Sequence, residues 1–161
     1  MRADIEAAFA IWETENATTL RVLRAIPEGR MDVRAAEKGW RLGDLAWHLC
    51  TSERWFCTGG AGLPEPAANP VPKDAPPATA AAMAAAREAS HAALVPLVRA
   101  RGEAWLDEVI DFYGMMRLPR LQILHLMLRH EVHHRGQLTV YLRLSGGRVP
   151  SVYGPSADDA G

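Results

Sequence analysis

Residues 119–147 read PRLQILHLMLRHEVHHRGQLTVYLRLSGG, and the architecture of the chain can be inferred outward from them. Pro119 is suited to the first turn of a helix, and Gly146-Gly147 is suited to its stop. On one face of this predicted helix, His130 and His134 lie one turn apart, with Cβ atoms roughly 5–6 Å from each other. Two ring nitrogens can therefore converge on one metal ion, for which neutral imidazole is a common ligand.

Three earlier helices are predicted from apolar residues at steps of three and four and from local stop signals. Pro27 ends the first helix, and Gly59-Gly60 ends the second. Thr79 can cap the third, Ala-rich helix, in which Pro96 would kink or fray the last turns. With the helix described above, the predicted ranges are 3–25, 42–58, 80–101 and 119–144.

Two segments between these helices are not predicted to be helical. Residues 62–77, GLPEPAANPVPKDAPP, hold six of the eleven prolines and are expected to form a long, extended surface connection between the second and third helices. Residues 105–116 alternate only loosely in polarity, so a short strand and an ordered loop are both open. Four helices with one long connection predict an all-α four-helix bundle, in a single domain over residues 1–161.

Composition and charge exclude several classes of function. The net charge of −1 lacks the excess of Lys and Arg that a nucleic-acid partner requires. The opening MRADIEAAFAIWETE is not a secretory signal, and no run of 18 uncharged apolar residues predicts a membrane span. Cys50 and Cys57, seven residues apart on one predicted helix, are too distant to bridge and are interpreted as reduced thiols. We therefore expect a cytoplasmic protein that acts on a small molecule.

The second predicted helix supplies a candidate third metal ligand, His48. Metal sites in helical bundles are built from inward-facing side chains of different helices. His48 shares a helical face with Leu45 and Ser52, which places it toward the core. Cys50 and Cys57 stand about 200° and 180° around the helix from it, at about 100° per residue, and so face away. Core histidines that form only hydrogen bonds are the alternative interpretation of the three imidazoles.

The remaining histidines fit a shared metal site less well. His91 lies alone on the third helix, and His125 is about 140° around the fourth helix from His130. His133 is next to the pair in angle but cannot complete the i, i+4 geometry. The roles of His125 and His133 are left open.

Two stretches together resemble the DinB-like family of small metalloproteins. They are WHLCTSERWF at 47–56 and HEVHHRGQLTVYLRLSGGRVPSVYG at 130–154. The family pattern has a histidine in the second helix, a His-x-x-x-His-Arg-Gly-Gln stretch in the fourth, and then an Arg, a Gly-rich stop and a Pro. The matching residues here are His48, His130, His134, Arg135, Gly136, Gln137, Arg143, Gly146 and Pro150.

The resemblance implies a DinB-type bundle, usually a homodimer, in which three histidines bind one divalent metal and leave a coordination position open. On this basis, His48, His130 and His134 are the expected ligands. Three imidazoles suit several late first-row metals, of which zinc and nickel are the leading candidates. Family members include thiol-dependent transferases and an isomerase, which use mycothiol, bacillithiol or glutathione, and many proteins without an assigned activity.

Five further residues are candidates for supporting the ligands or lining a pocket: Glu131, Arg135, Gln137, Trp55 and Tyr141. For Glu131, ligand support and a surface salt bridge are both open. Arg135 and Gln137 can instead bind neighbouring carbonyls or carboxylates, and the two aromatic residues can instead belong to the core. Glu131 also completes the string His-Glu-x-x-His of zinc proteases. A protease is nevertheless excluded, because no Glu follows Glu131 and no His follows His134 to act as the third ligand.

Two functions of different classes are compatible with these residues. The preferred one is a metal-dependent enzyme that activates a low-molecular-weight thiol, or less readily water, for attack on a small electrophile. Such an enzyme would be a thiol S-transferase rather than a hydrolase. The alternative is a non-catalytic metal-binding or stress-associated dimer. A homodimer is expected from the resemblance and from Phe9 and Trp12, which exceed the single buried stripe that the first helix needs.

Overall fold

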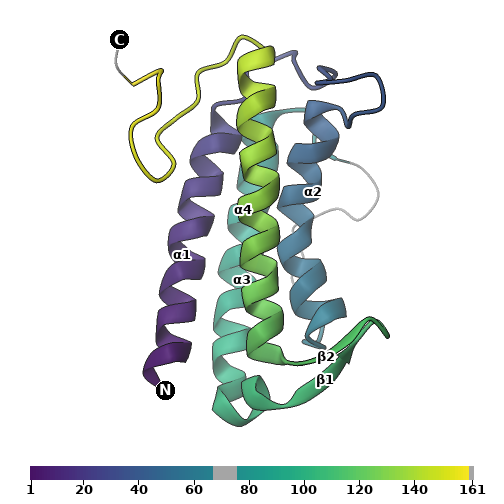
Figure 1. Ribbon diagram of the computed structural model, residues 1–161, viewed down its shortest axis with the longest axis vertical. Coiled ribbons are helices and arrows are strands. Elements are labelled where there is room, and N and C mark those ends of the chain that lie inside the picture. The colour runs from purple at the N-terminus through teal and green to yellow at the C-terminus, as the bar shows by residue number, and fades with distance from the viewer. Residues whose placement is uncertain (67–75, 160–161) are drawn as a thin grey trace.

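The computed structural model describes residues 1–66 and 76–159 of the chain. Within these ranges the chain forms four α-helices in a bundle and a small two-stranded sheet at one end of it (Figure 1), which confirms the predicted fold. Helices α2 and α3 run in one direction, opposite to α1 and α4. Both α1 and α2 pack against α3 and α4. In chain order the elements are α1 (Ala3–Arg24), α2 (Leu42–Trp55), the π-helix η1 (Phe56–Gly60), α3 (Ala80–Asp107), β1 (Val109–Phe112), β2 (Met116–Pro119) and α4 (Arg120–Leu144).

The helix boundaries follow the local sequence signals closely for α1 and α4 and less closely for α2 and α3. Thr79 caps α3 as expected, because its Oγ1 accepts a hydrogen bond of 3.2 Å from the Ala82 N–H. Helix α3 extends beyond its predicted end to Asp107. Gly102, at a φ of 76°, interrupts the helical backbone within it, a conformation that glycine tolerates. Helix α2 ends before the two glycines, at Trp55, and Gly59-Gly60 are the last residues of the π-helix η1 that follows it. None of the helices in the described ranges is long and apolar enough to cross a membrane.

The segment for which a strand and a loop were both open forms a β-hairpin after the end of α3. Strands β1 and β2 pair in antiparallel register, with Phe112 opposite Met116. The turn between them holds Tyr113 and Gly114 at φ angles of 55° and 70°. This left-handed conformation suits glycine and is unusual for tyrosine. Pro119 closes β2 and flanks α4 instead of forming its first turn.

The Pro-rich connection predicted between α2 and α3 is described only at its two flanks. Residues 67–75 lie outside the described part of the chain. Residues 62–66 and 76–79 contain neither helix nor strand. Glu65 and Pro76, one from each flank, line a large cavity beside α2.

The core consists of two apolar regions with polar side chains buried between them. One region lies toward the hairpin and includes Phe9 and Trp12, and the other includes Leu45 and Leu138. Between the two regions every helix contributes buried polar groups, because buried charges are tolerated when they find partners on neighbouring helices. We call this group the polar layer; it comprises Asn16, Thr19, Glu53, Arg87, His91 and Glu131.

Phe9 and Trp12 do not form the exposed apolar patch that the sequence predicted. Their exposed fractions are 2 % and 1 %, so both side chains lie inside the core of their own chain. The two rings stack with centroids 6.0 Å apart. This part of the argument for a dimer is therefore wrong, and the homodimer remains a prediction that depends on the family resemblance.

Candidate metal centre

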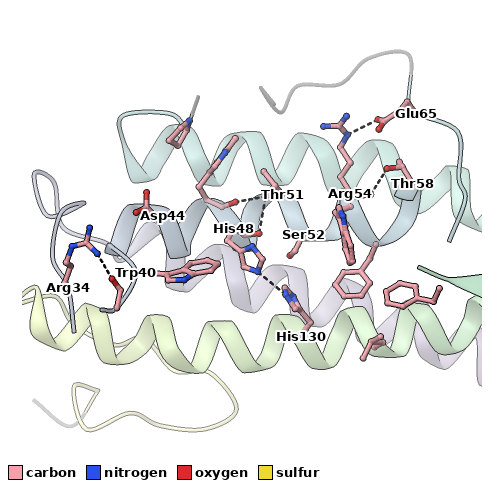
Figure 2. Close-up of a pocket in the computed structure, with 17 residues that line it drawn as sticks. Arg34, Trp40, Asp44, His48, Thr51, Ser52, Arg54, Thr58, Glu65 and His130 are labelled. Carbon is pink, nitrogen blue, oxygen red and sulfur yellow. Dashed lines mark hydrogen bonds and ion pairs between the residues drawn. The ribbon is translucent and has the colours of Figure 1, made fainter. Parts of the chain in front are cut away.

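The three histidines predicted as ligands come together between α2 and α4. One ring nitrogen from each of His48, His130 and His134 lies within 4.8 Å of the others. The Nε2 atoms of His48 and His130 are 3.0 Å apart, and Figure 2 shows the two rings facing each other from the two helices. His130 and His134, four residues apart on α4, and His48, on the inward face of α2, thus form one histidine cluster, which could hold a metal ion.

The orientation of the rings suits a cation. The Nε2 atoms of His48 and His130 point toward each other, and both lone pairs are available to an ion in the neutral tautomer with hydrogen on Nδ1. The Nδ1 atom of His134 lies 2.8 Å from the amide oxygen of Gln137. Nδ1 therefore carries the hydrogen, and Nε2 of His134 keeps its lone pair. A hydrogen bond of this kind, which fixes the tautomer and the ring plane, is typical of metal-binding histidines.

The histidine cluster is electrically neutral at neutral pH. Burial lowers the pKa of His48, His130 and His134 below its ordinary value, because desolvation disfavours the charged form. For His130 the pKa falls to about 4, since the neighbouring histidines add to the effect of burial. Neutral imidazole is the form that binds metals, so the cluster does not need to lose protons before an ion can bind at neutral pH.

Trp40 covers one side of the histidine cluster. Its ring stacks on His134 with an interplanar angle of 16° and meets His48 edge-on at a centroid distance of 4.8 Å. Sequence reasoning missed Trp40 because it lies in the irregular segment before α2, where no helical periodicity assigns it a face. The only local signal was its position two residues before the predicted start of that helix.

A cavity of about 1160 Å³ opens beside the histidine cluster (Figure 2). Small-molecule sites commonly measure about 300–1000 Å³, so this one has room for more than one small ligand. Its wall contains His48 and His130, and most of the remaining surface is aromatic or apolar. Within the described residues, the rest of the lining consists of Arg34, Gly39, Trp40, Asp44, Trp47, Thr51, Ser52, Arg54, Trp55, Phe56, Thr58, Glu65, Pro76, Phe112 and Leu126.

The two aromatic candidates take different positions. Trp55 lines the cavity and is 46 % exposed. Tyr141 is buried, is not among the lining residues, and donates a hydrogen bond of 2.9 Å from its hydroxyl to the Trp40 carbonyl oxygen. Tyr141 therefore supports the segment that carries Trp40 without facing the cavity.

Glu131 and Arg135 point away from the histidine cluster. Oε1 of Glu131 accepts hydrogen bonds from the Thr19 hydroxyl at 2.5 Å and from Arg87 at 2.8 Å. Glu131 is 1 % exposed, so the surface salt bridge considered from the sequence is wrong, and its ion pair with Arg87 is buried. Arg135 is also buried and binds both the carbonyl and the carboxylate of Glu15. Both residues hold α4 against its neighbours.

The remaining candidates lie outside the cluster. His91 is not alone: Nδ1 and Nε2 contact the carboxylates of Glu53 at 2.6 Å and Glu13 at 2.9 Å. His125 is half-buried elsewhere on α4, and His133 is exposed. Cys50 and Cys57 are free and buried, and neither lines the cavity. Burial raises the pKa of Cys50 to about 12, so its thiol stays protonated.

The fold and the site define this protein as a helical bundle with three clustered histidines beside a cavity whose wall contains His48 and His130. Comparison with known proteins identifies its family. Residues 1–160 match the model of the DinB family, so the chain belongs to that family. It is 30 % identical over 152 residues to the uncharacterized protein YrdA of Bacillus subtilis strain 168, covering 92 % of this chain and 87 % of that protein.

Two solved structures have the same fold. A DinB-like protein from Bacillus cereus ATCC 10987 superimposes with a TM-score of 0.80 at 27 % identity, over 92 % of this chain and 97 % of that one. The DinB-like protein YjoA of Bacillus subtilis superimposes with a TM-score of 0.70 at 18 % identity, over 93 % and 99 % of the two chains. The second likeness is evidence of fold alone.

Proposed function

We propose that the protein is a metal-dependent S-transferase in which His48, His130 and His134 hold one zinc or nickel ion. The cosubstrate is a low-molecular-weight thiol, and the acceptor is a small electrophile. The observation that most supports this function is that the histidine cluster lies beside a cavity of about 1160 Å³, whose wall contains His48 and His130, and not in the closed core. A cluster with a purely structural role would not need such access.

The metal ion would supply positive charge that lowers the pKa of a bound thiol, or of water where no thiol is present. The chain contributes three imidazoles that burial keeps neutral, with Gln137 fixing the tautomer of His134. In the reaction, the thiol sulfur forms a bond to the electrophilic carbon and the thiol proton passes to solvent. The electron pair of the bond that breaks leaves with the departing group.

The nucleophile comes from the cosubstrate and not from the chain. Cys50 and Cys57 are fully buried, and burial raises the pKa of both thiols. A protonated, inaccessible thiol is a poor nucleophile. We further propose that the enzyme works in the cytoplasm as a homodimer, which agrees with its two free cysteines and with the family resemblance.

The test is a thiol-dependent conjugation assay with 1-chloro-2,4-dinitrobenzene. The protein is stripped with a chelator, reloaded with zinc or nickel, and supplied in turn with glutathione, cysteine, bacillithiol or mycothiol. Turnover should require both the metal and a thiol, should be lost in His48→Ala, and should persist in Cys50→Ala and Cys57→Ala.

Three other results would count against this function. Turnover that survives metal removal would overturn the proposal. Metal-dependent hydrolysis of activated esters without any thiol would indicate a hydrolase. Stoichiometric metal binding with no turnover on any thiol would favour the non-catalytic, metal-binding alternative.

A further inference from the structure

The cavity has two ends of different character, on either side of the histidine cluster. Trp40, Arg34 and Asp44 lie at the end where α2 begins, and Arg54 lies at the opposite end, as Figure 2 shows. Trp55 follows His48 by seven residues on α2, a rise of about 10 Å toward the hairpin. We refer to the part of the cavity bounded by Trp55, Phe56, Phe112 and Leu126 as the hairpin end.

The shape of the hairpin end depends on two successive glycines in η1. A Cβ atom at Gly59 would overlap the hydroxyl of Tyr113, and one at Gly60 would lie 2.9 Å from Cε2 of Phe112. The two aromatic residues of the hairpin therefore dock where η1 has no side chains. Tyr113 holds this position in spite of its left-handed backbone, with a φ of 55°. Such a conformation persists when surrounding contacts determine it.

The docked hairpin fixes the ring of Trp55. Tyr113 stacks on one face of Trp55 with an interplanar angle of 6° and a centroid distance of 4.9 Å. Trp55 is nevertheless 46 % exposed and lines the cavity. An exposed tryptophan ring that is held in place costs little entropy when it binds a ligand, so it is a good binding surface.

The rings of Phe56 and Phe112 form the other walls of the hairpin end, which makes a corner next to the histidine cluster. Phe56 and Phe112 lie nearly parallel to each other, at 12°, and each stands almost perpendicular to Trp55, at 87° and 84°. Phe56 also touches His130, with ring centroids 5.2 Å apart. At the rim, Arg54 and Glu65 neutralise each other in an ion pair of 2.8 Å. An uncharged flat ring fits this corner, and its substituents would lie next to the cluster.

We propose that the hairpin end is a binding subsite for a flat, uncharged aromatic group, and that Tyr113 is the residue that positions its Trp55 wall. This inference rests on the proposed function in one respect: the aromatic group would belong to the electrophilic acceptor, and the thiol would occupy the end near Arg34. Binding of the aromatic group itself requires neither the metal nor turnover.

The experiment measures binding of N-phenyl-1-naphthylamine, a neutral aromatic probe that fluoresces in apolar sites, to the full chain before and after chelator treatment. Wild-type protein should bind one probe per chain in both states. Trp55→Ala should weaken binding about tenfold, the order expected for the loss of one aromatic stacking face. Tyr113→Gly should also weaken binding, because it removes the ring that holds Trp55 in place. Glycine tolerates the φ of residue 113, so the second variant keeps the turn.

Two matched controls come from the same chain. Trp40 is as exposed as Trp55, at 46 %, but lies at the other end of the cavity, and Met115 is 63 % exposed in the hairpin turn without lining the cavity. Trp40→Ala and Met115→Ala should bind the probe like wild type. The subsite is overturned if wild type does not bind, or if Trp40→Ala weakens binding as much as Trp55→Ala.

The outcome for the subsite is separable from the outcome for the proposed function. Probe binding that persists while no metal-dependent turnover is found would remove the function and leave the subsite. Turnover without probe binding would support the function and overturn the subsite. If Tyr113→Gly fails to fold, the surface-exposed Trp55→Ala decides the result alone.

Discussion

The same helices of this bundle carry two polar clusters, one open and one closed. The histidine cluster is half-buried, neutral and next to a large cavity, whereas the polar layer is charged and sealed inside the bundle. His130 and Glu131 are consecutive residues, yet one belongs to the open cluster and the other to the closed one. A step of about 100° on a helix is enough to separate them. The difference teaches that access, and not polarity, distinguishes the candidate metal site from the group that holds the helices together.

The stability of the protein should depend more strongly on a single charge in the polar layer than on the histidine cluster. Arg87 pairs with Glu131 at 2.8 Å, and both side chains are almost completely buried. Glu53 lies 3.9 Å from the same guanidinium and also accepts a hydrogen bond from Trp12. Removing one member of such a group leaves the opposite charge buried without a partner, which is costly.

The largest expected effect is therefore that of Arg87→Met. We expect it to lower the free energy of unfolding by about 3–5 kcal/mol, because Glu131 would lose its counter-charge and Glu53 would keep only His91 as a positive partner. Urea denaturation followed by circular dichroism measures the change. The matched control is Arg24→Met, which breaks the exposed 2.9 Å pair with Glu88 and should cost less than about 1 kcal/mol. Equal losses in the two variants would contradict the closed character of the polar layer.

A smaller effect is expected for Glu131→Gln. The substitution keeps the shape of the side chain and weakens the bonds to Thr19 and Arg87, so stability should fall by about 1–3 kcal/mol. Metal content, measured by elemental analysis of the purified variant, should equal that of wild type. Loss of metal would mean that Glu131 serves the histidine cluster and that the two clusters are not separate.

The open cluster should respond instead in its affinity for metal. Gln137→Ala removes the hydrogen bond that fixes the tautomer of His134, and we expect about tenfold weaker zinc binding. Because Gln137 is exposed, the stability of the metal-free protein should hardly change. The exposed Gln122 on the same helix provides the control, since Gln122→Ala should leave zinc affinity unchanged. Competition with a chromogenic chelator measures the zinc affinity of both variants.

The smallest expected effect is a pH dependence of stability that comes from His91. Burial alone lowers the pKa of His91, but the hydrogen bonds and charges of Glu53 and Glu13 outweigh it, and the pKa is raised. The folded pKa thus exceeds the value of about 6.5 for an unfolded chain. The stabilisation by charged His91 is complete below pH of about 6.5 and is lost as the pH rises through the folded pKa.

The measurement compares wild type with His91→Gln in urea denaturation. Titration of the other histidines is common to both proteins and cancels in the difference. The loss of stability on substitution should be larger at about pH 6 than at about pH 9. A difference that does not change with pH would show that folding leaves the pKa of His91 unchanged, which would contradict its raised value in the folded protein.

The fold could be predicted from the sequence where local signals control it. Proline and glycine mark the ends of α1 and α4, and the predicted boundaries lie within about one residue of those observed. The hairpin could not be predicted, because its position depends on the docking of Phe112 and Tyr113 against glycines about fifty residues earlier. Contacts of this range leave no trace in local periodicity.

The same distinction applies to the candidate site. The histidine cluster follows from i, i+4 spacing on one helix and from the inward face of another, both of which are local. The burial of Glu131 depends on Arg87, which belongs to a different helix, so the sequence could not decide between a surface and a buried ion pair. Trp40 was missed for a related reason, since it reaches the cluster from an irregular segment.

The central claim is that His48, His130 and His134 together bind one divalent metal ion, and a zinc titration of the metal-stripped protein tests it most directly. The matched control is His133, which is exposed and adjacent to His134 but lies outside the cluster. Wild type and His133→Ala should bind one ion per chain with equal affinity, while His48→Ala and His134→Ala should bind at least roughly 100-fold more weakly. If His48→Ala keeps the wild-type affinity, or if His133→Ala loses as much as His134→Ala, the account is contradicted.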